Sequence, residues 1–261
     1  MSLRDLTLEG ERDKVAIAIE RFRTFEPADG YFLAFSGGKD SVVILDLAKR
    51  AGVKFDAHYH MTTVDPPELV HFIRKHPEVQ VERGKSMWQL IREHGMLPTR
   101  TRRFCCQELK ECGGRGRVVV TGVRWEESAR RKNRRMTEIC YASNSGGKRY
   151  LHPIIDWSED EVWEYIRTYD VPYCSLYDEG FRRLGCVLCP FTRNVAVEMA
   201  RWPKLAASYR RMADVAVEVR RERAVEGMNT QFANGQEYWD WWIDRDASLP
   251  NEDQMVLGVY E

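Results

Sequence analysis

The sequence predicts an α/β fold: a doubly wound, mostly parallel sheet with helices on both faces, followed by a helical C-terminal extension. Two observations predict it. Up to about residue 193, short apolar runs alternate with stretches whose apolar residues recur at helical spacing, and strands alternating with helices favour a covered parallel sheet. From residue 194 the pattern changes to long, charged, helical stretches. We therefore expect one domain over 1–193 and a helical extension over 194–261.

The elements of the expected sheet domain follow one another regularly. A five-residue apolar run opens the series, and the next helical pattern ends at a glycine, which commonly stops a helix. Later helices are marked by prolines at one start and by Ser86 at another. In chain order we expect strand 31–35, helix 41–52, strand 54–61, helix 66–77, strand 79–83, helix 86–95 and a buried strand 117–124.

Composition limits the classes of function. The chain has 261 residues and is 43% hydrophobic, enough for a substantial core. Its 40 basic and 40 acidic residues cancel, so only a local basic surface could attract nucleic acid. No apolar stretch reaches the roughly 20 residues of a membrane span, and the first residues lack the apolar core of a signal peptide. We expect a cytoplasmic protein without a membrane partner.

The stretch "SGGKDS", residues 36–41, falls between the first strand and its helix. Ligands of open parallel sheets bind beyond the carboxyl ends of the strands. Two glycines let backbone N–H groups converge on an anion, and the helix dipole adds to the attraction. Phosphate is the expected ligand, although the spacing is not that of a Walker A loop. The alternative is a glycine-rich turn that binds nothing.

This stretch resembles the pyrophosphate loop (PP-loop) of the N-type ATP pyrophosphatases. The resemblance implies that ATP is split between its α and β phosphates, that a substrate is adenylated, and that Mg²⁺ neutralises the charge of the departing pyrophosphate. Lys39 and Asp40 would be catalytic. The residues that would bind pyrophosphate are Ser36, Gly37, Gly38, Lys39, Asp40 and Ser41.

Seven cysteines in a chain without an export signal favour metal or redox chemistry over disulfides. Cys105 and Cys106 are adjacent, and Cys186 and Cys189 form a C-x-x-C pair. Four thiolates from two places suit a [4Fe–4S] cluster or a tetrahedral zinc. Adjacent cysteines are awkward for a zinc ribbon, and core thiols without a metal are a third interpretation.

The spacing of these two pairs resembles the cysteine set that holds a [4Fe–4S] cluster in assimilatory adenylyl-sulfate reductases and in related DNA phosphorothioation proteins. The resemblance implies a [4Fe–4S] cluster here. The remaining cysteines fit no ligand spacing. We expect Cys112, Cys140 and Cys174 to be buried and to act as small hydrophobic residues.

Three further stretches, "GVRWEESARR", "HPIIDWSEDEVWEYI" and "VPYCSLYDEGFRRLGC", follow in order. Together with the loop they resemble the phosphoadenosine phosphosulfate (PAPS) reductase family, a branch of the adenine nucleotide alpha hydrolase-like folds, over about 31–193. The resemblance implies a nucleotide-binding domain in which a catalytic Arg124 lies at the end of the fourth strand, where arginines can contact phosphate or sulfate oxygens. The residues that would face the nucleotide there are Gly122, Arg124, Glu127, Ser128 and Arg131. A solvated charge run is the alternative for residues 130–135.

Two departures from the family point away from sulfonucleotide reduction. The reductases carry a nucleophilic cysteine in a C-terminal tail, whereas no cysteine follows Cys189 here. Their pyrophosphate loops also tend to be eroded, whereas this one is intact. We therefore expect an adenylating ATP pyrophosphatase that takes part in sulfur transfer, with a cysteine desulfurase as a candidate donor and a nucleic acid as a candidate substrate. The alternatives are an adenylyl-sulfate or phosphoadenylyl-sulfate reductase and a non-catalytic, nucleotide-binding iron–sulfur partner or sensor.

Overall fold

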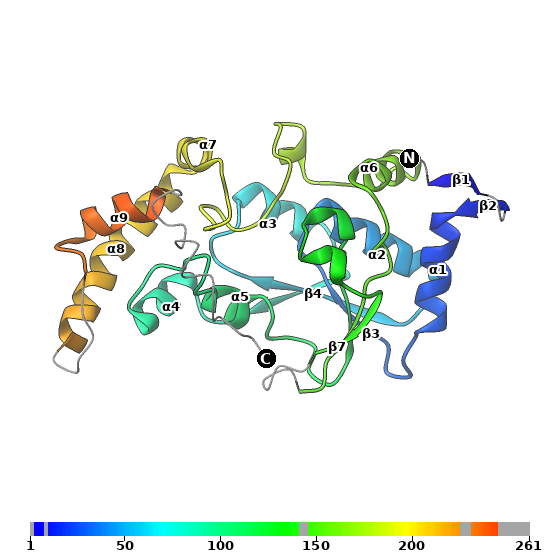
Figure 1. The fold of residues 1–261 in the computed structure, drawn as a ribbon, viewed down its shortest axis with the longest axis horizontal. Helices are drawn as coiled ribbons and strands as arrows, with labels where there is room; N and C mark the ends of the chain where they lie inside the picture. Colours follow the sequence, from blue (N-terminus) through cyan, green and yellow to red (C-terminus); the bar gives the residue numbers. More distant parts are fainter. Residues whose placement is uncertain (1–2, 8–9, 141–145, 225–230, 245–261) are drawn as a thin grey trace. The chain divides into compact units, whose positions relative to one another are not determined.

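A computed structural model describes residues 3–7, 10–140, 146–224 and 231–244, and the chain divides into two compact units (Figure 1). The sheet unit comprises Met1–His60, Pro67–Glu82 and Gly113–Leu184. The helical unit comprises Met61–Pro66, Arg83–Cys112 and Gly185–Glu261. This division differs from the expected boundary at residue 193, because three stretches of the expected sheet domain, 61–66, 83–112 and 185–193, belong to the same unit as the C-terminal helices. Residues 245–261 of the expected extension lie outside the described residues.

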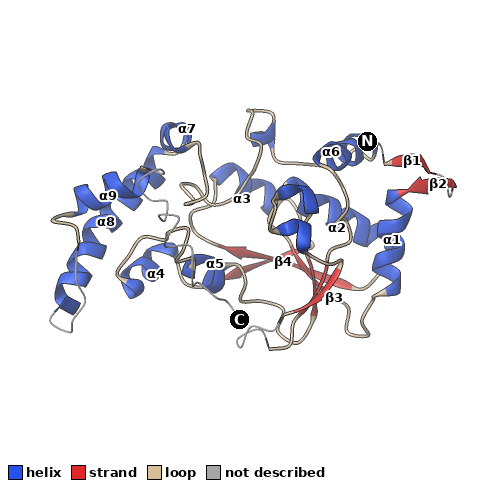
Figure 2. Ribbon diagram, viewed as in Figure 1, coloured by secondary structure: helices blue, strands red, loops and turns tan. Residues whose placement is uncertain are grey.

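The sheet has six strands in the order β5-β4-β3-β6-β8-β7, and Figure 2 draws the strands in red and the helices in blue. Strand β3 is parallel to β4 and β6, β6 is parallel to β8, and β7 pairs antiparallel with β8. The strands are β3 (Tyr31–Ala34), β4 (Phe55–Met61), β5 (Val79–Arg83), β6 (Val118–Val120), β7 (Thr137–Ile139) and β8 (Arg149–Leu151). The predicted α/β fold with a mostly parallel sheet is confirmed, as is a helical C-terminal region.

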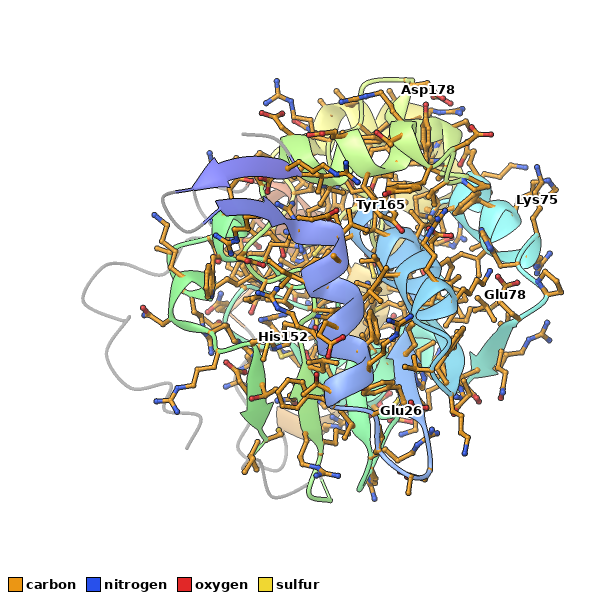
Figure 3. The ribbon with its side chains drawn as sticks, turned by 90° about the vertical axis from the view of Figure 1, so that its right-hand side faces the viewer. Glu26, Lys75, Glu78, His152, Tyr165 and Asp178 are labelled. Atoms are coloured by element: carbon orange, nitrogen blue, oxygen red, sulfur yellow. The ribbon has the colours of Figure 1, made fainter. Side chains whose placement is uncertain are left out.

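Helices of the sheet unit pack on one another as well as on the sheet. Helix α2 contacts both α1 and α6, and Figure 3 shows Tyr165 of α6 close to α2, where its hydroxyl donates to Asp46 at 2.6 Å. The bounds are α1 (Lys14–Thr24), α2 (Lys39–Ala51), α3 (Pro67–Arg74) and α6 (Glu159–Thr168), with short 3₁₀ turns η1 (Trp125–Glu127), η2 (Arg131–Asn133) and η3 (Ser175–Tyr177). Strands β1 (Arg4–Thr7) and β2 (Gly10–Asp13) form a separate antiparallel pair.

The helical unit is built around α8, which packs against α4, α7 and α9. The Tyr238 hydroxyl accepts a hydrogen bond from the Leu97 N–H at 2.8 Å, and Trp242 Nε1 donates to the Pro98 carbonyl at 2.7 Å. These bonds explain why the segment after α4 belongs with the C-terminal helices. The bounds are α4 (Met87–His94), α5 (Phe104–Leu109), α7 (Val195–Arg201), α8 (Pro203–Ala224) and α9 (Gly235–Ile243).

The elements that position the site agree closely with the sequence patterns. Tyr31 and Leu33 of β3 are fully buried, as a central strand of a parallel sheet requires. Ser86 caps α4 through a complete capping box. The apolar run expected as a strand over 117–124 is extended only to Val120, so the four residues after it form a loop at the end of the sheet. None of the helices among the described residues has the length and apolar character needed to cross a membrane.

A buried ion pair joins α1 to α6. Lys14 Nζ donates to both carboxylate oxygens of Glu161, at 2.6 and 2.8 Å, and Glu161 is fully buried. Lys14→Met should therefore lower the free energy of unfolding by about 3–5 kcal/mol, because it leaves a buried carboxylate without its cation. Adding Glu161→Gln to that variant should recover part of the loss. Urea denaturation of both variants measures the effect, and a single variant as stable as the wild type would contradict it.

Candidate nucleotide and cysteine sites

The "SGGKDS" loop joins β3 to α2 at the carboxyl end of the central strand. Strand β3 ends at Ala34 and α2 begins at Lys39, with Gly38 as its N-cap. Gly37 has φ of +74°, and a Cβ there would lie 2.7 Å from Leu69 Cδ1 of α3. Both the conformation and the close packing require glycine at this position. The loop thus has the strand-turn-helix setting that the sequence predicted.

Serine hydroxyls shape the loop from within. Ser41 Oγ donates to the Gly38 carbonyl at 2.8 Å, and Ser36 Oγ donates to Ser41 Oγ at 3.3 Å. The Gly38 N–H points to Ser36 Oγ at 3.4 Å. The first N–H groups of an α-helix lack the acceptors of a preceding turn, although here the Ser41 N–H reaches back to the Gly38 carbonyl at 2.9 Å. They therefore form a positive helix end around these small side chains, of the kind that binds anions.

Asp40 is held by the loop that follows β6. Arg124 Nε donates to Asp40 Oδ1 at 2.6 Å, and the same guanidinium reaches Glu126 Oε2 at 3.2 Å and the Trp157 carbonyl at 3.3 Å. Arg124 is only 2% exposed. A Cβ at Gly122 would come within 2.8 Å of Asp40 Cβ, so glycine lets the two segments touch. The structure brings Gly122, Arg124 and Asp40 together and gives Arg124 a role in positioning Asp40; a direct phosphate contact by Arg124 stays a prediction.

Glu127, Ser128 and Arg131 build the turn beside this pair. Glu127 Oε1 accepts from the Arg124 N–H at 2.9 Å, and its other oxygen pairs with the Arg131 guanidinium. Ser128 Oγ accepts from the Arg131 N–H at 3.3 Å. Burial, with Arg183 and Arg134 close by, lowers the pKa of Arg131. Arg131 therefore lies near two further guanidinium groups and within electrostatic reach of Asp40.

Lys39 is buried, and its contacts reveal a residue that the sequence did not mark as functional. Its Nζ lies 3.6 Å from Asp40 Oδ2 and 3.8 Å from Glu159 Oε1, and 5.9 Å from the centre of the Tyr177 ring. The Lys39 N–H donates to the Tyr177 hydroxyl at 2.9 Å. Tyr177 belongs to the stretch "VPYCSLYDEGFRRLGC", but 138 positions separate it from Lys39, so nothing local in the sequence indicates the contact.

All four cysteines of the predicted tetrad belong to the helical unit. Cys105 and Cys106 lie on the short helix α5, and Cys186 and Cys189 lie in the segment before α7. Each of the four is half-buried. The Val187 N–H donates to the Val64 carbonyl at 2.9 Å, which anchors the C-x-x-C segment within the unit.

The thiols influence one another electrostatically. A hydrogen bond with Cys106, burial and the nearby Cys186 and Cys189 thiols raise the pKa of Cys105. The same hydrogen bond and that of Arg103, whose Nη2 lies 3.4 Å from Cys106 Sγ, lower the pKa of Cys106. Burial raises the pKa of Cys186 to about 12, although the Lys110 ammonium opposes the rise. Four neighbouring thiols beside two cations form a donor set that suits a negatively charged metal–thiolate group.

The described residues contain no group of three or more His, Cys, Asp or Glu side chains already arranged around a point where one metal ion could bind. The cluster therefore stays a prediction. None of the seven cysteines, all of them in the described part of the chain, forms a disulfide. Cys174 is buried as expected, but the expectation was wrong for Cys112, which is exposed in the turn after α5, and Cys140 is only half-buried.

The chain is similar in sequence to several known proteins. An uncharacterized protein of Methanocaldococcus jannaschii is 32% identical over 62% of this chain and 41% of its own length, so the chain spans about two fifths of that relative. Adenosine 5'-phosphosulfate reductases of Staphylococcus haemolyticus and Allochromatium vinosum are each 27% identical, over 64% and 65% of this chain and 72% and 70% of theirs. The crystal structure of phosphoadenylyl-sulfate reductase from Candida auris aligns with a TM-score of 0.49 at 20% identity, covering 70% of this chain and 96% of that one.

The phosphoadenosine phosphosulfate reductase domain matches residues 30–192. This range begins one residue before β3 and ends before α7, so it contains the loop, the Arg124 turn and all four cysteines of the tetrad. The agreement extends over well more than half of the chain, and the chain belongs to the phosphoadenosine phosphosulfate reductase domain family.

Proposed function

We propose that the chain binds ATP with Mg²⁺ at the 36–41 loop, splits it between the α and β phosphates, adenylates an acceptor and takes part in sulfur transfer. The observation that carries the proposal is the intact loop at the start of α2. Its Asp40 carboxylate is held in place by Arg124, whose Nε lies 2.6 Å from Asp40 Oδ1. The start of a helix directs several backbone N–H groups and the positive end of its dipole toward an anion, which suits the charge of a pyrophosphate.

The start of α2, two loop side chains and Arg131 have separate roles in this proposal. The N–H groups at the start of α2 would bind β and γ phosphate oxygens, and the Lys39 ammonium would add positive charge. Mg²⁺ would neutralise the departing pyrophosphate, with the Asp40 carboxylate as its protein ligand. Arg131 lies near Arg134 and Arg183, and would hold further phosphate oxygens through its guanidinium.

The cysteine tetrad completes the proposal. Cys105, Cys106, Cys186 and Cys189 would hold a [4Fe–4S] cluster, and Arg103 and Lys110 would balance its negative charge. The cluster would supply electron transfer or a site for sulfur.

Four thiolates need a reducing compartment, so we place the protein in the cytoplasm. A cysteine desulfurase would suit as sulfur donor, and the basic run 130–135 leaves a nucleic acid open as the acceptor.

Reduction of a sulfonucleotide is the second candidate. The similarity to adenosine 5'-phosphosulfate reductases favours it. The two functions differ in what they require of the loop, because a sulfonucleotide has no β,γ-pyrophosphate for it to bind.

Calorimetry with Mg²⁺ and ATP tests the proposal. Gly38→Val should weaken binding at least about tenfold, because a Cβ there already lies 3.5 Å from Ser36 Oγ and from the Tyr177 hydroxyl, and two methyl groups would block the approach of phosphate. Asp40→Ala should weaken it similarly by removing the carboxylate that would hold the metal. Glu20→Ala, which removes an exposed carboxylate on α1, is the control. Equal affinity in all four proteins would refute a pyrophosphate loop.

A further inference from the structure

The Tyr177 hydroxyl sits on a backbone donor of the loop. The Lys39 N–H donates to it at 2.9 Å, and Lys39 is the first residue of α2. The N–H of a first helical residue has no acceptor within its helix. It is one of the groups that an anion at the helix start would use. A neutral side-chain oxygen therefore fills an anion-binding position.

Aromatic packing holds Tyr177 in this place. Its ring meets Trp163 of α6 edge to face, with ring centres 5.1 Å apart, and lies 6.4 Å from Tyr173. Leu176, the residue before it, is fully buried. Burial raises the pKa of the Tyr177 phenol, although the hydrogen bond from Lys39 opposes the rise. The hydroxyl is therefore protonated and neutral at physiological pH, unlike the phosphate oxygen that would replace it.

The outer part of the same segment faces solvent. Asp178 and Tyr173 are exposed and bond to each other at 2.9 Å, and Figure 3 shows Asp178 at the outer edge of the molecule. Gly180 has φ of +92°, and a Cβ there would meet nothing within 4 Å. Residues 178–180 are thus exposed to solvent, while the Tyr177 ring beside them is packed on Trp163.

We propose that Tyr177 is a displaceable gate on the loop: its hydroxyl takes the place of one phosphate oxygen, and a pyrophosphate group binds by taking the Lys39 N–H and releasing the tyrosine. This inference rests on the proposed function. The exchange favours the ligand, because a hydrogen bond to a charged phosphate oxygen is stronger than one to a neutral hydroxyl. Release of the tyrosine thereby indicates an occupied loop, since only a ligand that bonds to the Lys39 N–H displaces it.

Tyr177→Phe separates a gate from a ligand-binding residue. The variant keeps the ring and its packing but has no hydroxyl to compete, so pyrophosphate with Mg²⁺ should bind about three- to tenfold more tightly by calorimetry, the effect of one net hydrogen bond. Tyr238→Phe is the matched control, because its hydroxyl also accepts from a backbone N–H, that of Leu97 at 2.8 Å, which belongs neither to the loop nor to the 177–180 segment. It should bind like the wild type.

Hydrogen exchange of the full chain provides the second measurement. Pyrophosphate should slow exchange at residues 39–41 and speed it at Asp178 and Gly180, whose N–H groups bond to the carbonyls of Ser175 and Tyr177. Weaker binding by Tyr177→Phe, or slower exchange over 177–180, would make Tyr177 a ligand of the phosphate and overturn the gate. Unchanged affinity in Tyr177→Phe would also overturn it. Failure of every protein to bind pyrophosphate and ATP would instead overturn the proposed function.

Discussion

Replacing Cys186 with serine is expected to remove iron from the protein. Purified without oxygen, the wild type should be brown, absorb broadly at about 400 nm and contain about four iron atoms per chain. Cys186→Ser should lose most of that iron and colour, because a serine hydroxyl is a far weaker ligand for iron than a thiolate. Cys189→Ser should behave in the same way. Iron analysis and the visible spectrum measure the change.

Cys174→Ser is the control for this experiment. Cys174 is buried, but it belongs to the sheet unit, whereas the tetrad belongs to the helical unit. The same chemical change should therefore leave the iron content unaltered. Colourless wild-type protein with one zinc per chain, after growth with ample iron, would contradict the cluster and favour the tetrahedral zinc alternative.

Loss of Arg124 is expected to have the largest effect on the loop. Arg124→Met removes the cation that holds Asp40 and Glu126, so the two carboxylates should repel each other and the loop should lose its shape. We expect ATP affinity to fall more than tenfold and the free energy of unfolding to fall by about 2–3 kcal/mol. That is less than for a fully buried pair, because the Asp40 side chain is 23% exposed and is partly screened. Arg124→Lys should rescue little, since an ammonium lacks the planar fork that serves three acceptors.

Arg50→Met is the matched control. Arg50 also bonds to an aspartate of α2, with its Nε 2.6 Å from Asp46 Oδ2, but Arg50 is exposed and Asp46 keeps its hydrogen bond from Tyr165 when Arg50 is lost. Its loss should cost less than about 1 kcal/mol and leave ATP binding intact. Calorimetry and urea denaturation on both variants give the comparison. An Arg124→Met protein that binds ATP as the wild type does would show that Asp40 needs no support from the β6 loop.

The sequence predicts the loop well because its signals are local. An apolar strand, two glycines and a helical pattern are contiguous, and β3, Gly37 and α2 appear where those signals place them. The contact that the Arg124 side chain makes could not be predicted, because its partner Asp40 is 84 positions away. The contact between Tyr177 and Lys39 depends in the same way on the folded chain. Only packing brings these side chains together.

Short or ambiguous elements were also missed. Helix α1 contains Val15, Ile17 and Ile19 at alternating positions, which is the spacing of a strand. Helix α5, which carries Cys105 and Cys106, has six residues, too few to show a helical period. The strand expected over 117–124 stops at Val120 because the chain then turns, and Gly122 packs against Asp40.

The central claim is that the loop serves cleavage of ATP rather than reduction of a sulfonucleotide. The most direct measurement scores pyrophosphate and sulfite on one iron-loaded preparation. One half receives ATP, Mg²⁺ and a dialysed cell extract as the source of acceptor. The other receives adenylyl sulfate or its 3′-phosphorylated form with thioredoxin that dithiothreitol keeps reduced. We predict equal amounts of AMP and pyrophosphate that disappear with Asp40→Ala, and no sulfite. Thioredoxin-dependent sulfite over many turnovers, without AMP and pyrophosphate from ATP, would contradict the claim and establish the reductase.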